Sequence, residues 1–454
     1  MEKTIAAVAT GNAAGGIGVI RISGEKAIEI ADKVFKAADG SSLLNLDGYR
    51  AKFGNIVSDG RMLDNAVALV FRAPKSYTGE NVCELSVHGG LFIVEKTLEA
   101  VLNAGAVPAE PGEFTKRAFL NGKMDLTQAE SVADLISAQG ETSVQASFNA
   151  LQGSLSNKIN GILDSLMDCS ANLAAWVDYP DEEIPDMDDE ALGETIIHAA
   201  KELKSLLVNY DSGQAMVQGI DTAIVGRPNV GKSTLMNLLA GKDKSIVTNI
   251  EGTTRDIVEE SVRLGSLVLR LSDTAGLRNT RDAVESIGVE RAYAKLDEAM
   301  LVLAVFDSNR PLIKEDLKLI EHCRGKRAIA VINKIDLTQR ADLEMITSAF
   351  DKYIFISAKK GKSTKELEAA IKEIVGAADF DTSAPILANQ RQKICCTNAM
   401  NYCFEAHTCL IAGVTRDAVN VLVDSAIDEL LSLTGRKANI EIVNNIFSRF
   451  CVGK

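Results

Sequence analysis

The sequence predicts a protein that combines a small α+β domain, a domain of long helices and an inserted α/β domain with a mainly parallel sheet. Three changes of pattern along the chain support this prediction. Short β-like runs occur in residues 1–120. Most apolar residues between 132 and 176 recur every three or four positions, and residues 190–210 and 385–454 also look helical. Strand runs alternate with helical stretches in 216–379. Because the α/β region lies between two helical regions, residues 121–215 and 380–454, we expect the helical halves to form one domain with the α/β domain inserted.

The N-terminal region has the pattern of a small α+β domain. Its short apolar runs are separated by turns rich in Gly and Asp, which favour strands joined by tight connections. One longer run, residues 91–102, has the spacing of a helix. The predicted strands cover residues 4–10, 18–22, 66–71 and 82–87.

The next region carries an apolar stripe that predicts the buried face of long helices. The stripe ends at Asp178-Tyr179-Pro180, because proline disfavours continuation of a helix. We interpret the acidic stretch 178–190 as a solvated loop that caps a further helix over residues 190–210. The stripe consists of Val132, Ile136, Val144, Phe148, Leu151, Leu155, Ile159, Ile162, Leu166, Cys169, Leu173 and Trp176.

The inserted region alternates apolar strand runs with helical stretches. Strands of a parallel sheet are covered by helices on both faces, so they appear as continuous apolar runs. The predicted strands cover residues 222–226, 267–272, 299–307, 327–333 and 353–357.

The composition is that of an acidic globular protein. The chain has 454 residues, and 49 Lys and Arg against 62 Asp and Glu give a formal charge of 49 − 62 = −13. Phosphate contacts need clustered Lys and Arg, so an RNA partner would require a local basic patch or a second protein. We find no targeting segment, and the longest apolar run, residues 300–306, is far below the about 20 residues of a membrane span. We therefore expect a cytoplasmic protein without a membrane span.

The chain has 8 cysteines and no CxxC pair, a pattern typical of reduced thiols in a cytosolic protein. Four metal-ligating residue types lie close together: Cys396, Cys403, His407 and Cys409. Two interpretations remain open for them, namely a metal site and a helix that uses thiols as small core residues.

A phosphate-binding loop is predicted at residues 226–233, which read GRPNVGKS and fit the pattern G-x-x-x-x-G-K-[ST]. The loop follows a predicted strand and precedes an apolar helix over residues 234–240, which is the context that the motif requires. Glycines let backbone N–H groups wrap the phosphates, and the helix N-terminus adds a favourable dipole. We expect Lys232 to reach the β- and γ-phosphates and the Ser233 hydroxyl to ligate Mg²⁺.

Residues 333–336 read NKID and end a predicted strand. The carboxylate of Asp336 can accept hydrogen bonds from both the N1–H and the 2-amino group of guanine, a pair of donors that adenine lacks. The sequence SAK at residues 357–359 follows the last predicted strand and would place a backbone N–H near the guanine oxygen. Together with the phosphate-binding loop, these motifs predict a Ras-like P-loop G domain that selects GTP.

Two further loops are predicted to respond to the γ-phosphate. Residues 273–276 read DTAG, with Asp273 placed to hold Mg²⁺ through water, and residues 252–256 read GTTRD, where a Thr can bind Mg²⁺. The predicted GTP-binding residues are Asn229, Val230, Gly231, Lys232, Ser233, Thr234, Thr248, Asn249, Ile250, Glu251, Gly252, Thr253, Thr254, Asp273, Thr274, Ala275, Gly276, Asn333, Lys334, Asp336, Ser357, Ala358 and Lys359.

The residue after DTAG is Leu277, where many small GTPases place a Gln that orients the attacking water. A leucine neither accepts protons nor forms hydrogen bonds. Water must therefore be positioned from elsewhere, or hydrolysis is negligible.

Motifs along nearly the whole chain resemble those of the MnmE (TrmE) family of tRNA-modification GTPases. They are VIRISG at residues 19–24, YTGE at 77–80, HGG at 88–90, PGEFT at 111–115 through Lys123, YPDEEI at 179–184 and the final CVGK at 451–454. A prenylation box is the rival interpretation of the last four residues, although a terminal Lys is not a usual final residue of that motif.

The resemblance implies a homodimer that works with a flavoprotein partner, MnmG (GidA), in a heterotetramer, with tRNA bound largely through the partner. It implies addition of a carboxymethylaminomethyl-type group to the wobble uridine of certain tRNAs. The carbon would come from a tetrahydrofolate derivative, 5-formyl or 5,10-methylene, bound by the N-terminal domain. The implied folate-binding residues are Arg21, Glu84, Lys123 and Lys454.

The resemblance also implies potassium-activated hydrolysis. The implied potassium ligands are Asn229 with Thr248, Ile250 and Thr253, while Thr254 joins Ser233 at Mg²⁺. Glu285 would orient the attacking water, which would answer the problem posed by Leu277. Cys451 is an implied catalytic residue, and a buried terminal thiol is the alternative.

Two other classes of function compete with this one. A ribosome-assembly GTPase would carry the same nucleotide motifs but usually adds a basic RNA-binding domain. A folate-dependent one-carbon transferase with a vestigial G domain would not need a complete set of nucleotide motifs. The folate-like N-terminal motifs and the charge of −13 disfavour the first class, and the complete nucleotide motifs disfavour the second.

Overall fold

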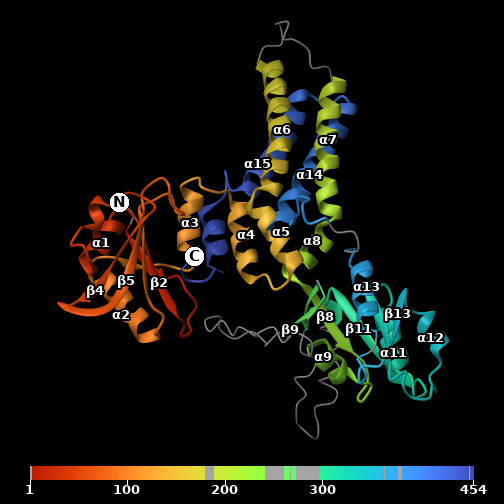
Figure 1. Ribbon diagram of the computed structural model, residues 1–454. Coiled ribbons are helices and arrows are strands. Elements are labelled where there is room, and N and C mark those ends of the chain that lie inside the picture. Colours follow the sequence, from red (N-terminus) through yellow and green to blue (C-terminus); the bar gives the residue numbers. More distant parts are fainter. Residues whose placement is uncertain are drawn as a thin grey trace. The chain divides into compact units, whose positions relative to one another are not determined.

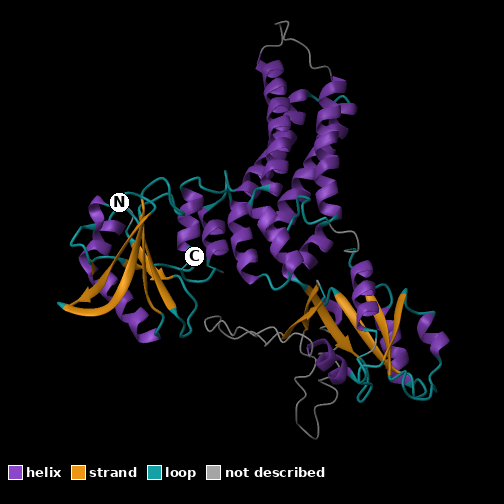
Figure 2. Cartoon of the chain, viewed as in Figure 1, coloured by secondary structure: helices purple, strands orange, loops and turns teal. Residues whose placement is uncertain are grey.

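The computed structural model describes residues 3–178, 189–240, 260–265, 267–271, 296–361, 363–376, 381–448 and 450–453 (Figure 1). The chain forms two compact units, one of residues 1–133 with 430–454 and the other of residues 134–429. Each unit has its own core, and Figure 2 shows that both contain helices as well as strands. Among the described residues, no helix is long and apolar enough to cross a bilayer.

The first unit is built on a seven-stranded sheet with the order β3-β4-β5-β6-β2-β1-β7. Every pairing is antiparallel except that of β1 with β7. Helices α1 and α2 pack on the face that presents Ile20, Ile22 and Leu85, and these residues form the core. The strands are β1 (Ile5–Val8), β2 (Ile17–Ser23), β3 (Phe35–Ala37), β4 (Arg50–Ser58), β5 (Arg61–Phe71), β6 (Val82–His88) and β7 (Val107–Pro108), and the helices are α1 (Ala27–Val34) and α2 (Leu91–Asn103).

Successive side chains of a strand point to opposite faces, so the other face of this sheet presents Arg21 and Glu84, which are paired across β2 and β6. On the same face Phe53 pairs with Val67 across β4 and β5, and these side chains are 60% and 40% exposed. This face therefore combines a charged pair with exposed apolar side chains.

Residues near the C-terminus complete the first unit. Helix α16 (Ile440–Phe447) packs on α3 (Glu113–Leu120), where the Lys116 Nζ donates to the Asn444 Oδ1 at 2.7 Å. The ring centroids of Phe119 and Phe447 are 6.3 Å apart. Residues 430–454, which the sequence analysis grouped with the second helical region, thus fold with the N-terminal sheet.

The second unit joins a helical bundle to an α/β domain. Helix α7 packs against α6 and α14, although the whole α/β domain separates α7 from α14 in sequence. The Cys396 Sγ of α14 donates to the Leu203 carbonyl of α7 at 3.6 Å. The helices are α4 (Leu126–Ser137), which begins in the first unit, α5 (Glu141–Leu151), α6 (Ser154–Asp178), α7 (Asp189–Val208), α8 (Tyr210–Gln218), α14 (Gln390–Ile411) and α15 (Arg416–Thr434).

The predicted apolar stripe is buried in α6, whereas before α6 only Val132 of the stripe is buried. In α6 the stripe residues from Leu155 to Leu173 are buried, as predicted, whereas Ile136, Val144 and Phe148 are exposed. For Val144 and Phe148 the physical reason is that α5 packs on α8 through its small side chains, which brings the two helices close together. There the Ser143 Oγ donates to the Val217 carbonyl at 2.6 Å.

The α/β domain has a six-stranded sheet with the order β13-β12-β11-β8-β10-β9. All neighbours pair in parallel except β10 with β9, so the predicted mainly parallel sheet is confirmed. One apolar core lies on each face of the sheet. The elements are β8 (Ile220–Val225), α9 (Lys232–Ala240), β9 (Glu260–Leu264), β10 (Leu267–Leu271), β11 (Leu301–Asp307), α11 (Lys314–Cys323), β12 (Ala328–Asn333), α12 (Leu343–Thr347), β13 (Lys352–Ile356) and α13 (Thr364–Ile374).

The packing of α7 predicts the cost of a cavity in the bundle. Leu203 is fully buried, so Leu203→Ala should reduce the free energy of unfolding of this unit by about 2–5 kcal/mol. Val208 lies on the same helix and is 73% exposed, so Val208→Ala should change it by less than about 0.5 kcal/mol. Urea unfolding followed by circular dichroism measures both variants. Equal midpoints for the two variants would contradict the packing described here.

Candidate nucleotide-binding site

The loop between β8 and α9 requires glycine at two positions. Gly226 and Gly231 have φ angles of 152° and 103°, which other residues rarely adopt. A Cβ on Gly226 would lie 2.5 Å from the Val305 carbonyl oxygen, and one on Gly231 would collide with the Asn333 side-chain nitrogen. The backbone of the loop is therefore held close to the ends of β11 and β12.

Lys232 begins helix α9 and turns back over this loop. Its Nζ donates to the carbonyls of Gly226 at 2.5 Å and Arg227 at 2.9 Å. Burial lowers the pKa of the Lys232 ammonium, because a desolvated cation is disfavoured. A phosphate in the loop would offset this desolvation, which is the chemistry expected of a phosphate-binding lysine.

The buried side chain of Asn333 connects three of the predicted nucleotide motifs. Its Nδ2 donates to the Val230 carbonyl of the loop at 2.9 Å. Its Oδ1 accepts from the backbone N–H of Lys334 at 2.8 Å and of Ala358 at 3.0 Å. One amide thus fixes the positions of the phosphate-binding loop, the NKID segment and the SAK segment relative to one another.

Asp336 is oriented by the SAK segment. The Ser357 Oγ donates to the Asp336 Oδ1 at 2.8 Å, and Lys360 lies 3.9 Å from the other carboxylate oxygen. The hydrogen bond from Ser357 lowers the pKa of Asp336 most, with a smaller effect of nearby lysines. The carboxylate is therefore ionised at neutral pH and available as an acceptor of two hydrogen bonds.

Lys334 makes a second connection between the NKID segment and the phosphate-binding loop. Its Nζ donates to the Asn229 carbonyl at 2.6 Å and to the Asp307 carboxylate at 2.7 Å. Asp307 was not among the predicted site residues. Its position at the carboxyl end of the buried strand β11, where ligands of parallel sheets bind, was the signal that could have indicated it.

The remaining predicted residues are only partly described. Ser233 and Thr234 lie in the first turn of α9, and the side chain of Val230, a residue of the loop, is buried. Asn229 has a φ of 65°, in the left-handed region that Asn tolerates. Outside the described residues are Thr248, Asn249, Ile250, Glu251, Gly252, Thr253, Thr254, Asp273, Thr274, Ala275, Gly276, Leu277 and Glu285.

Arg21 and Glu84 form a second candidate site on the sheet of the first unit. The Arg21 Nε donates to the Glu84 Oε1 at 2.8 Å, and both side chains are largely buried. The Arg21 guanidinium lies 5.7 Å from the ring centroids of both Tyr77 and Phe114. A cavity of about 180 Å³ is lined by Arg21, Phe71, Tyr77, Val82 and Glu84.

The other predicted residues of this unit make different contacts. The Lys123 Nζ donates to the Pro74 carbonyl at 3.1 Å, so Lys123 does not join the ion pair of Arg21 with Glu84. Cys451 is exposed, which disfavours the interpretation of a buried terminal thiol, and its carbonyl accepts from the Gly112 N–H at 3.4 Å. Lys454 lies outside the described residues.

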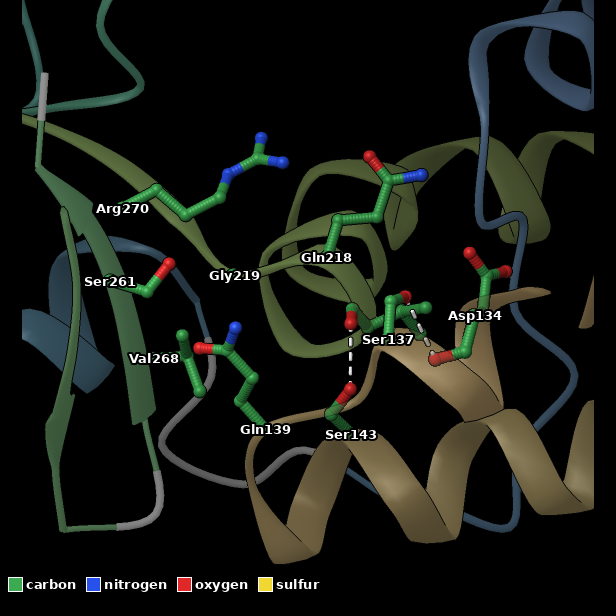
Figure 3. Close-up of a pocket in the computed structure, with 10 residues that line it drawn as sticks. Asp134, Ser137, Gln139, Ser143, Gln218, Gly219, Ser261, Val268 and Arg270 are labelled. Atoms are coloured by element: carbon green, nitrogen blue, oxygen red, sulfur yellow. Dashed lines mark hydrogen bonds between the residues drawn. The ribbon is translucent and has the colours of Figure 1, made fainter. Parts of the chain in front are cut away.

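A larger cavity, of about 320 Å³, lies in the second unit and contains none of the predicted site residues (Figure 3). Its walls include Ser143 and Gln218 from the helices and Ser261 and Arg270 from strands β9 and β10. Arg270 is engaged in a bidentate pair with Asp221, at 2.8 Å for each contact. The motifs that carry nucleotide chemistry, rather than the volume of this cavity, therefore mark the candidate site.

The cysteine cluster of α14 is part of the helical core. Cys396 and Cys403 are buried, and burial raises the pKa of each thiol to about 12, so both stay protonated. Across the part of the chain that the structure describes, no group of three His, Cys, Asp or Glu residues could hold a metal ion. The burial of Cys396 and Cys403 favours the interpretation of these two thiols as core residues.

Two family models together match nearly the entire chain. The model described as the MnmE helical domain matches residues 126–451, and the one described as the GTP-binding protein TrmE N-terminus matches residues 4–123.

Solved structures resemble part of the chain. One is Era of Aquifex aeolicus bound to GDP and aluminium fluoride, with 27% identity, a TM-score of 0.27 and coverage of 40% of this chain and 66% of that one. Another is the G domain of the T. maritima FeoB iron transporter, with 26% identity, a TM-score of 0.26 and coverage of 34% and 98%.

Full-length relatives share the same name. The chain is 39% identical over 458 residues to the tRNA modification GTPase MnmE of Acetivibrio thermocellus, with coverage of 100% of this chain and 99% of that protein. It is 41% identical over 457 residues to the tRNA modification GTPase MnmE of Symbiobacterium thermophilum, with complete coverage of both. These full-length matches agree with the nucleotide motifs described above, and the chain belongs to the MnmE (TrmE) family of tRNA modification GTPases.

Proposed function

We propose that this chain is a potassium-activated GTP hydrolase that adds a carboxymethylaminomethyl-type group to the wobble uridine of certain tRNAs. It works as a homodimer with the flavoprotein MnmG (GidA), in the cytoplasm, and uses a tetrahydrofolate one-carbon unit. The observation that carries the GTP-dependent part is the side chain of Asn333, which holds the phosphate-binding loop beside the segment that contains Asp336. A triphosphate and a guanine base can thus be bound at once.

Base selection rests on the Asp336 carboxylate. Two parallel acceptor atoms match the N1–H and the 2-amino group of guanine, and Ser357 keeps the carboxylate oriented. The backbone N–H of Lys359 faces the guanine oxygen in this proposal. Adenine would leave the carboxylate without its donors, which is costly once the bound base covers the carboxylate.

Replacement of Asp336 by Asn should change the preferred base from guanine to xanthine. The amide keeps one acceptor and gains a donor, so it opposes the 2-amino group of guanine but matches the 2-oxo group of xanthine. We expect Asp336→Asn to weaken GTP binding by about 100-fold, the magnitude of one or two hydrogen bonds to a charged group, and to improve XTP binding. Calorimetric titration with both nucleotides measures this. Unchanged preference for GTP would contradict the assignment of Asp336.

The metal ions are assigned to the loop around the triphosphate. The hydroxyl oxygens of Ser233 and Thr254 suit Mg²⁺, a hard cation that prefers oxygen ligands. The oxygen of Asn229 and those contributed by Thr248, Ile250 and Thr253 suit potassium. This monovalent ion supplies positive charge next to the β- and γ-phosphates when bound. Glu285 accepts a hydrogen bond from the attacking water and so orients it.

The proposal predicts that turnover depends on the monovalent cation. An arginine finger, whose charge the cation replaces, contributes about 10³–10⁵ in rate. We expect GTP hydrolysis in potassium to exceed that in sodium at equal ionic strength by at least about tenfold. Phosphate release at saturating GTP provides the measurement, and Glu285→Ala should bind GTP normally but remain slow in both salts. Equal rates in the two salts would remove the potassium site from the proposal.

The proposed folate site is the cavity beside Arg21 and Glu84. A carboxylate suits the donor edge of a pterin, and the aromatic rings of Phe71 and Tyr77 form apolar walls for a planar ligand. Lys123 and Lys454 are assigned to the acidic tail of the folate, and Cys451, exposed near this unit's C-terminal end, to the catalytic step. The exposed Phe53 and Val67 on the same sheet face support its use as the homodimer surface.

The decisive experiment is mass spectrometry of tRNA nucleosides from cells that lack this protein. The wobble modification should disappear and should return with the wild-type chain and with Glu95→Gln, which changes an exposed residue of α2. Glu84→Gln should not restore it, because the ion pair with Arg21 is lost and an amide NH2 donor replaces one of the two carboxylate acceptors proposed for the pterin.

The two possible failures of this experiment have different meanings. Retention of the modification in cells without the protein would refute a role in tRNA modification and would favour a ribosome-assembly GTPase. Full restoration by Glu84→Gln would leave that role intact but would exclude this cavity as the folate site.

A further inference from the structure

Two buried carboxylates support the nucleotide motifs from the side of α11. Asp307 ends β11 and Asp316 lies in the first turn of α11, and they are 3% and 1% exposed. Each is paired with a basic side chain from a nucleotide motif: the Lys334 Nζ lies 2.7 Å from Asp307, and the Arg227 Nη1 lies 3.4 Å from Asp316. We call residues 307–316 the β11–α11 arm.

Backbone contacts hold this arm in place at both ends. The Asp307 Oδ1 accepts from the Asn309 N–H at 3.0 Å, and the Asp316 Oδ2 accepts from the Ile313 N–H at 3.1 Å. Between them, the Ser308 N–H donates to the carbonyl of Asn333 at 2.9 Å. The arm is therefore joined to the end of β12, where the guanine motif begins.

Burial makes these pairs different from ordinary surface ion pairs. Exposed pairs such as Arg324 with Glu321 are largely screened by water and contribute little. Removal of one partner of a buried pair leaves an uncompensated buried charge, which strongly destabilises the local structure. Arg227 is itself largely buried, so its position and that of Asp316 are coupled.

We propose that Asp307 and Asp316 are positioning residues for GTP. Through Arg227 and Lys334, they fix the positions of the phosphate-binding loop and the guanine motif relative to one another. Neither carboxylate touches the nucleotide in this proposal. Asp316 acts on the phosphate side alone, because Arg227 belongs to the loop. Asp307 acts on both sides, because Lys334 belongs to the guanine motif and also donates to the Asn229 carbonyl of the loop.

The alternative is that Asp316 serves only to begin helix α11. Replacement by Asn separates these roles, since the Asn oxygen still accepts from the Ile313 N–H while the charge that holds Arg227 is lost. Glu315 is an exposed neighbour on the same helix, so Glu315→Gln removes a charge of the same sign without touching Arg227.

The test is calorimetric titration of GTP, GDP and ATP into the full chain, with thermal unfolding to show that each variant is folded. We expect Asp316→Asn and Arg227→Ala each to weaken GTP and GDP binding by about tenfold, with an unchanged ratio of GTP to ATP affinity. The double variant should lose no more than either single variant, because the two side chains act as one pair. Glu315→Gln should bind as the wild type does.

Asp307→Asn should behave differently, because it removes the charge that holds Lys334, which belongs to the guanine motif and also donates to the Asn229 carbonyl of the loop. We expect it to weaken GTP binding and also to reduce the preference for GTP over ATP. The proposal is overturned if folded Asp316→Asn binds GTP as tightly as the wild type, or if the effects of Asp316→Asn and Arg227→Ala add independently. If Asp307→Asn keeps the base preference of the wild type, the arm positions only the phosphate-binding loop. The proposal that it also positions the guanine motif would then be refuted.

Discussion

The hydrogen bonds of Asn333 are the interaction on which the nucleotide site depends. This side chain is buried and uses both its donor and its acceptor atoms. A water molecule in place of the amide could not hold the loops in the same positions. Three loops that lie far apart in sequence are held to one amide group. The same contact shows why residue 231 must be glycine, since a side chain there would displace the Asn333 nitrogen.

The first unit also contains a network of buried, paired charges. The buried Arg117 donates to Glu80 at 3.1 Å and to Glu113 at 2.7 Å. The Ser23 Oγ donates to the same Glu80 at 2.6 Å. Both units thus contain buried, paired charges next to the elements that carry their candidate sites. In the first unit the candidate site lies on one face of the central strands β2 and β6, and in the second it lies at the carboxyl ends of the parallel strands.

The sequence was sufficient for features that local chemistry dictates, and insufficient for those created by packing. The phosphate-binding loop and the parallel strands were predictable, because glycines at that spacing and continuous apolar runs are compatible with few alternative structures. Asp307 and the contact between Arg227 and Asp316 were not, because they arise only when β11 is placed between β8 and β12. The exposure of Val144 and Phe148 was missed because periodicity shows that a helix has an apolar face but not which face its neighbours cover.

The return of residues 430–454 to the first unit has a consequence for biosynthesis. These residues leave the ribosome about 300 residues after residue 133, an interval of about 15–60 s at usual rates of translation. Until then Phe119 and Leu126 lack the segment that later covers them, since Gly435 packs against both and Phe447 against Phe119. The nascent N-terminal unit therefore carries an uncovered apolar surface on α3 and α4 while the GTPase domain emerges.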